Sequence, residues 1–155
     1  MKTFELFQSL LGRNKLAQMT LSQLVTLVAD KPTVKNRNAF YHSFLVSRVG
    51  ARIPNPSGSL QAGIRVTTQE DQVSLPTTTG PDGTTMILVY CDIPRMAAVH
   101  PEDTFIEVDG RVVLEMAEKE NFGVIVQDLL EGKESWAGVP KEHVAEILAG
   151  KYGNV

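Results

Sequence analysis

The chain has 155 residues, a length typical of one domain, of which 43% are hydrophobic and 21% are charged. A domain of this size buries about 70% of the surface that its unfolded chain exposes, so it needs no disulfide or metal ion in order to fold. The net charge of −3 argues against general nucleic-acid binding, which requires a basic surface.

The sequence indicates a reducing compartment. The single cysteine, Cys91, cannot form an internal disulfide. The N-terminal residues lack the continuous apolar core and the small-residue cleavage site of a signal peptide. The apolar stretches fall far short of the ~20 residues that a membrane-spanning helix needs. We therefore expect a cytoplasmic protein that contacts no membrane.

Three helices are predicted in the first fifty residues. Thr20 and Gln23 have the spacing of a capping box that begins the second helix, and Thr33 is the expected cap of the third. Gly50 is the expected stop of the third helix. The apolar positions at helical spacing are Phe4, Leu6, Phe7, Leu10 and Leu11 in the first helix, Leu21, Leu24, Val25, Leu27 and Val28 in the second, and Phe40, Tyr41, Phe44 and Leu45 in the third.

Strands and helices are expected to alternate in the rest of the chain. The region from Arg52 to Gly63 is predicted to be a loop or a short linker, and Pro81–Gly83 a turn. The expected strands are Gly63–Thr68, Gln72–Leu75, Thr85–Tyr90, Phe105–Val108 and Gly123–Val126, of which Thr85–Tyr90 has the apolar run of a central strand. The expected helices begin at Asp92, Asp109 and Pro140.

This alternation predicts an α/β (or α+β) fold, with a central mixed sheet and helices packed on it. A helical N-terminal segment, residues 1–50, precedes the α/β body, residues 51–155. We expect the two parts to form a single domain.

Four segments of the sequence resemble a known family. They are Asn38–Ser47 leading to Ile53–Pro54, Asp82–Asp92, Gly123–Asp128, and Ser135–Pro140 with the helix that follows. Together they are similar to the N-terminal domain of the SseB family, which is named for enhanced serine sensitivity. The similarity extends over approximately residues 20–150. The chain departs from the family pattern at Tyr90–Cys91–Asp92, where the family has an aromatic residue, Thr and Ser, and at Gln127–Asp128, which replaces an Asn.

The resemblance implies a bacterial domain that is found near secretion and toxin-immunity systems. It implies no established reaction, since none of the matching segments is a catalytic motif.

Motifs for catalysis or metal binding are not recognised in the sequence. It lacks the GxxxxGK[ST] phosphate loop and the GxSxG nucleophile elbow. Cys91 precedes Arg95 by two residues too few for a phosphatase-type thiolate loop, and we expect this cysteine to be buried and inert. His42, His100 and His143 occur singly, without the spacing of zinc ligands. We expect no catalytic residue, no metal ion and no cofactor.

Charge is distributed unevenly along the chain. Residues 13–52 contain seven Lys and Arg against one Asp, whereas residues 102–134 contain ten Asp and Glu against three Lys and Arg. Solvated faces are the simpler interpretation, and an electrostatic docking surface is the alternative. Trp136, the single tryptophan, is expected in the core, with a partner contact as the alternative.

The leading hypothesis is non-catalytic protein–protein recognition. In its most concrete form, the chain is an accessory or immunity-type protein of a bacterial secretion or toxin system, such as type VI secretion. It would bind and occlude a partner protein, for example a basic toxin or effector. The alternative is a small-molecule or regulatory sensor with a pocket at the C-terminal edge of the sheet, and an enzyme comes third. The candidate partner-binding residues are Glu107, Asp109, Asp128, Glu131, Glu134 and Trp136, and several of the carboxylates are expected to share a surface at one rim of the sheet.

Overall fold

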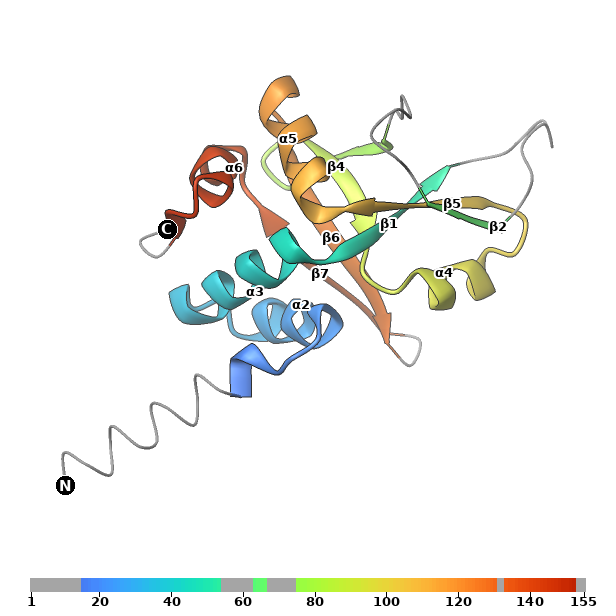
Figure 1. Cartoon of the computed structure of the whole chain (residues 1–155), viewed down its shortest axis with the longest axis horizontal. Coiled ribbons are helices and arrows are strands. Elements are labelled where there is room, and N and C mark those ends of the chain that lie inside the picture. Colours follow the sequence, from blue (N-terminus) through green and yellow to red (C-terminus); the bar gives the residue numbers. More distant parts are fainter. Residues whose placement is uncertain (1–14, 54–62, 67–74, 131–132, 153–155) are drawn as a thin grey trace.

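A mixed β-sheet with helices on both faces forms the body of the molecule (Figure 1). The computed structural model describes residues 15–53, 63–66, 75–130 and 133–152. Its elements are α2 (Leu21–Asp30), α3 (Val34–Val46), β1 (Arg48–Ile53), β2 (Gly63–Val66), β3 (Thr77–Thr79), β4 (Thr85–Tyr90), α4 (Ile93–Val99), β5 (Thr104–Asp109), α5 (Gly110–Glu120), β6 (Gly123–Leu130), β7 (Lys133–Val139) and α6 (Lys141–Leu148). The predicted α/β class with a mixed sheet is confirmed.

The caps of the first two described helices follow from the sequence. The Thr20 hydroxyl accepts a hydrogen bond from the Gln23 backbone N–H, and the Gln23 side chain accepts one from the Thr20 N–H. This is the predicted capping box, which satisfies two N–H groups that the helix leaves without partners. Thr33 caps α3 as predicted. The helix predicted over residues 4–11 lies outside the described residues.

The sheet places β4 and β6 side by side and parallel, with β7 at one edge. The strand order is β2-β5-β1-β4-β6-β7, and β3 pairs with the first half of β4. β2 and β5 are also parallel, whereas β1 runs antiparallel to both of its neighbours and β7 runs antiparallel to β6. The apolar run of β4 therefore occupies the central position that the sequence predicted.

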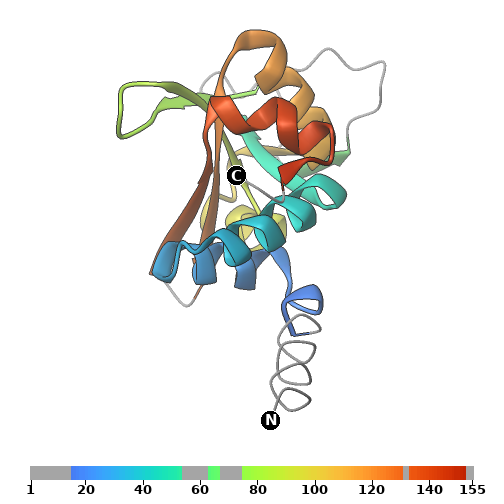
Figure 2. The same ribbon diagram turned by 90° about the vertical axis from the view of Figure 1, so that its left-hand side faces the viewer.

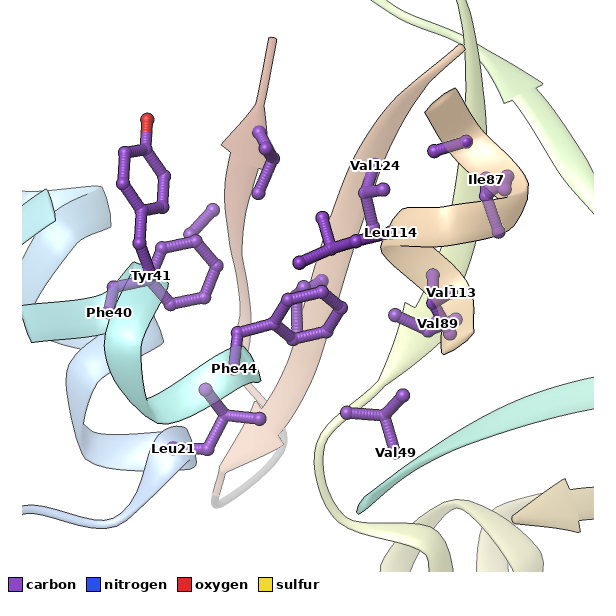
Figure 3. Packing of buried hydrophobic residues seen from close by; sticks show 14 of the residues in the cluster. Leu21, Phe40, Tyr41, Phe44, Val49, Ile87, Val89, Val113, Leu114 and Val124 are labelled. Carbon is purple, nitrogen blue, oxygen red and sulfur yellow. The ribbon is translucent and has the colours of Figure 1, made fainter. Parts of the chain in front are cut away.

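Most of the core lies between the sheet and four helices: α2, α3, α5 and α6 (Figure 2). Phe44 points from α3 toward Leu114 of α5 and Val124 of β6, and all three side chains are fully buried (Figure 3). Alternate strand residues point to the opposite face of the sheet, where α4 packs on Tyr90 and Phe105.

The expected end of the third helix is wrong. Gly50 is not a helix stop, because α3 ends at Val46 and Gly50 lies in β1, where it pairs with Glu107 and Tyr90. A Cβ atom on Gly50 would lie 2.6 Å from Ile93 Cγ1, so a glycine at this position lets α4 approach the sheet closely. The segment 48–53 contains few strand-forming residues, and its strand conformation depends on its position between β4 and β5.

β7 was also missed, since no strand was predicted over residues 133–139. In the structure all seven residues pair with β6. The sequence of this strand is short of β-branched residues, so its hydrogen-bonded partner decides its conformation. The predicted strand at 72–75 falls largely outside the described residues, and Leu75 precedes β3.

Within the described ranges, no helix is long and apolar enough to span a bilayer.

Candidate functional site

Trp136 lies on the outer face of the edge strand β7. Its neighbours Ser135 and Ala137 point toward the helices and are buried, whereas Trp136 points away from them and exposes 48% of its surface. The expectation that Trp136 belongs to the core is therefore wrong. The physical reason is that α4, the helix on this face, packs on the β5 side of the sheet and leaves β7 uncovered (Figure 1).

An apolar groove of about 300 Å³ lies beside Trp136. Met86 and Gly138 line it on the sheet, and Pro81 and Pro140 on the adjoining turns. Met86 is buried. A Cβ atom on Gly123 would lie 2.8 Å from its Cε, and one on Gly138 would lie 3.9 Å from it. The glycines thus make room for the methionine side chain, and the groove remains open between it and the indole. Charged residues at the rim are Asp82, Lys141 and Glu142.

A second, larger groove of about 680 Å³ runs between α2 and β7. Its walls include Thr26 and Leu27 of α2 and residues 133–136 of β7, and Asp30 adds a carboxylate. Trp136 lines both grooves, so the two grooves adjoin each other at this residue.

The acidic candidates that the structure describes lie in three separate places: on β5, on β7 and in the interior. Glu107 and Asp109 lie on β5, where Arg48 holds them with N–O distances of 3.1 and 2.9 Å. Glu107 shares a cross-strand row with Gly50, Tyr90, Gln127 and Trp136, and it projects on the same face as Trp136. Four strand spacings of about 4.8 Å nevertheless separate it from Trp136.

Only part of the remaining acidic set is near the tryptophan. Glu134 is exposed and lies two residues from Trp136 on the same face of β7, so these two candidate residues are brought together. Glu131 lies outside the described residues. Asp128, by contrast, is buried, and its side chain cannot contact a partner in this structure.

Asp128 is the buried centre of a polar cluster that also contains the partly exposed residues Ser22, Cys91, Asp92 and Arg95. Its Oδ1 accepts hydrogen bonds from Ser22 Oγ at 3.3 Å and from Arg95 Nη1 at 3.1 Å. Arg95 also pairs with Asp92 at 3.0 Å and donates to the Leu129 carbonyl oxygen at 2.7 Å. The cluster joins α2 and α4 at the carboxyl ends of the parallel strands β4 and β6. Neither Ser22 nor Arg95 was singled out for this role, and no local motif in the sequence indicates the contact.

Residues 21–130 match the family described as SseB protein N-terminal domain. The chain belongs to the SseB family. No curated protein and no solved structure matches it. β7 and α6 follow the residues that the SseB domain match covers.

The two departures from the SseB pattern noted above meet in the structure. Cys91 and Asp92 follow β4, Asp128 lies near the end of β6, and both segments contribute to this polar cluster. A carboxylate on the core face needs a cation, and Arg95 supplies it.

The position of Cys91 within this cluster disfavours ionisation of its thiol. Its Sγ donates a hydrogen bond to the Gln127 carbonyl oxygen at 3.3 Å, and Ser22 Oγ lies 3.5 Å from Sγ. Burial raises the pKa of the Cys91 thiol to about 12, and the negative charge of Asp128 contributes in the same direction. The thiol therefore stays protonated at neutral pH, and the thiolate is the form that acts as a nucleophile.

Two of the three histidines contact tyrosine hydroxyl groups. His143 Nδ1 lies 3.2 Å from the Tyr41 hydroxyl, and His42 Nδ1 lies 2.8 Å from that of Tyr152. Burial raises the pKa of Tyr41. His100 caps the C-terminus of α4. In the part of the chain that the structure describes, no three His, Cys, Asp or Glu side chains are grouped so that they could hold a metal ion.

Proposed function

We propose that this SseB-domain protein acts without catalysis, by binding another protein. In its concrete form the proposal is an accessory or immunity-type protein of a bacterial secretion or toxin system, such as type VI secretion, that occludes its partner in the cytoplasm. The observation that carries it is the exposure of Trp136 on an edge strand, beside an apolar groove. Tryptophan is enriched among the residues that dominate binding energy at protein interfaces.

The chemistry of the polar cluster around Asp128 supports a binding role over catalysis. A protonated thiol and a carboxylate already paired with arginine are poorly suited to act as nucleophile and base. The same cluster bears on the alternative of a small-molecule sensor. A sensor's pocket is expected at the carboxyl ends of β4 and β6. At this position Arg95 bridges Asp92 and Asp128, so these side chains pair with each other there. This arrangement favours the binding role over the sensor.

Co-expression with the products of the neighbouring genes tests this function. The wild-type chain is expected to restore growth in the presence of a toxic neighbour, and to form a stable complex with it in purified form. Trp136→Ala should weaken this complex about tenfold or more, as hot-spot substitutions do. Val112→Ala is the matched control, because Val112 is a partly exposed apolar residue on α5. If no neighbour product binds the wild-type chain, the proposal is wrong.

A further inference from the structure

The edge of the sheet at β7 is available for another strand. Among the strands of the described residues, β7 pairs with β6 alone. The backbone groups on its other side therefore point away from the sheet, and such an edge is a template for pairing with another chain. Figure 2 shows the β6–β7 hairpin along one side of the molecule, with α2, α3, α5 and α6 to its right. The groove of about 680 Å³ next to residues 133–136 provides room beside the strand.

The outer face of β7 presents three successive positions with different chemistry. Glu134, Trp136 and Gly138 project on this face, because side chains alternate along a strand. A residue that pairs opposite Gly138 would meet no side chain there. Its own side chain could lie over the glycine into the apolar groove that Met86 and Trp136 line.

The charge of this surface favours a basic partner segment. Glu134 is the charged residue on the outer face of β7, and none of the described ion pairs includes it. The two grooves are lined by four carboxylates, from Asp30, Asp82, Glu134 and Glu142. They are also lined by two ammonium groups, from Lys133 and Lys141. The carboxylates are in excess, so a lysine or arginine is the better complement.

We propose that β7 receives an extended segment of the partner protein as an additional strand, which places an apolar side chain opposite Gly138 and a basic side chain opposite Glu134. These two residues of the segment are four positions apart, because Gly138 and Glu134 are four positions apart on β7. Both side chains lie on the same face, about 13 Å from each other. This inference rests on the proposed function and names the kind of segment that the partner presents.

Synthetic peptides test the spacing directly. The probe is an acetylated, amidated threonine-rich peptide, TTLTTTKTT, since threonine favours the extended conformation. The control, TTLTTKTTT, has the same composition but carries Leu and Lys three positions apart, on opposite faces. Titration into the 15N-labelled chain is expected to shift amide signals of β7 and the indole signal of Trp136 at millimolar peptide. The control should bind about tenfold more weakly.

Three variants connect the binding to the named residues. Trp136→Ala should weaken binding of TTLTTTKTT about tenfold. Glu134→Lys should reverse the charge preference, so that TTLTTTETT binds about threefold more tightly than TTLTTTKTT. Val112→Ala, on α5, should bind the probe as the wild type does.

N-methylation of the peptide distinguishes strand addition from a simple side-chain contact. Two versions of the peptide are made, one methylated on the odd-numbered and the other on the even-numbered backbone nitrogens. Because successive N–H groups of a strand point to opposite edges, each version has one edge of the peptide strand blocked. One should lose binding and the other retain it, because an added strand forms its bonds along one edge.

Several outcomes overturn the proposal. They are the absence of binding at millimolar peptide, equal binding of probe and control, and shifts that lie outside β7 and its grooves. A concentration-dependent dimer in sedimentation, abolished by Trp136→Ala, would assign the edge to a second copy of the chain instead. If a neighbouring gene product binds with unchanged affinity to both the Trp136→Ala and the Glu134→Lys variant, the proposed function stands and this inference fails.

Discussion

Arg95 donates a hydrogen bond to Asp128 over 3.1 Å, and the Asp128 side chain has no exposed surface. Arg95 itself is about one-third exposed, so the pair extends from the interior to the surface. Through it, α4 is attached to the end of β6. A carboxylate this deep in the protein is tolerated only with a partner, because transfer of an unpaired charge out of water is costly.

Substitution of Arg95 by Met should therefore strongly destabilise the fold. We expect a loss of about 3 kcal/mol in the free energy of unfolding, measured in urea, because the variant leaves Asp128 buried without its cation. Arg48→Met is the matched control. Its partners Glu107 and Asp109 are partly exposed, so that variant should lose less than about 1 kcal/mol. Equal losses in the two variants would contradict a special role for the buried pair.

The Cys91 thiol should react slowly with iodoacetamide in the folded protein. With the pKa at about 12, the thiolate fraction at pH 8 is far below that of a free cysteine. Greater nucleophilicity of the thiolate compensates in part, which leaves an expected slowing of about ten- to a hundredfold. Alkylation measured by mass spectrometry, with the urea-unfolded chain as reference, checks this. Rapid alkylation of the native protein would contradict it.

The same thiol should make the fold less stable in alkaline solution. An unfolded cysteine has a pKa of about 8.5, and the folded value is raised to about 12. Between these values the unfolded chain has lost the proton while the folded chain retains it. The stability contribution of the neutral thiol is thus fully present below about pH 8.5 and is lost as the pH rises toward 12. Cys91→Ala should unfold with a shallower pH dependence across this range, as followed by circular dichroism.

Gly110→Ala should disrupt the contact between α3 and α5. A Cβ atom at this position would lie 1.8 Å from the carbonyl oxygen of Phe44, which belongs to the backbone and cannot rotate aside. The two helices must separate, at an expected cost of about 3 kcal/mol. Gly83→Ala is the comparison: Gly83 has φ of 82° but no atom within 4 Å, so it should cost about 1–2 kcal/mol. Thermal melts of both variants measure the difference.

Trp136→Ala should weaken partner binding while it changes the free energy of unfolding only slightly. Because the indole is half exposed and lies on an edge strand, its removal should cost less than about 1.5 kcal/mol in the free energy of unfolding. The wild-type indole should also be accessible to acrylamide quenching, and a bound partner should protect it. A large loss of stability, with poor quenching, would place the indole inside the fold.

Local sequence signals predicted those elements whose residues carry their own structural preference. The Thr20–Gln23 box and the apolar run of β4 are examples, since a cap needs only neighbouring residues and a buried strand reveals itself by composition. β1 was missed because its strand conformation comes from partners that are distant in the sequence, and β7 because its own residues have little strand preference, although β6 directly precedes it. The candidate functional site also depends on contacts that local sequence signals do not indicate. Trp136 is exposed because α4 covers another part of its face of the sheet, and Asp128 is buried because α2 and Arg95 pack on it. No residue near either position in the sequence indicates these contacts.

The contact between Ser22 and Asp128 spans 106 positions of the sequence. α2 is synthesised before β6 and β7, yet the surface on which it docks includes both of these strands. β6 and β7 therefore cannot cover the apolar side of α2 until they and the intervening strands have emerged from the ribosome. During this interval chaperones are the natural protection for the exposed helix.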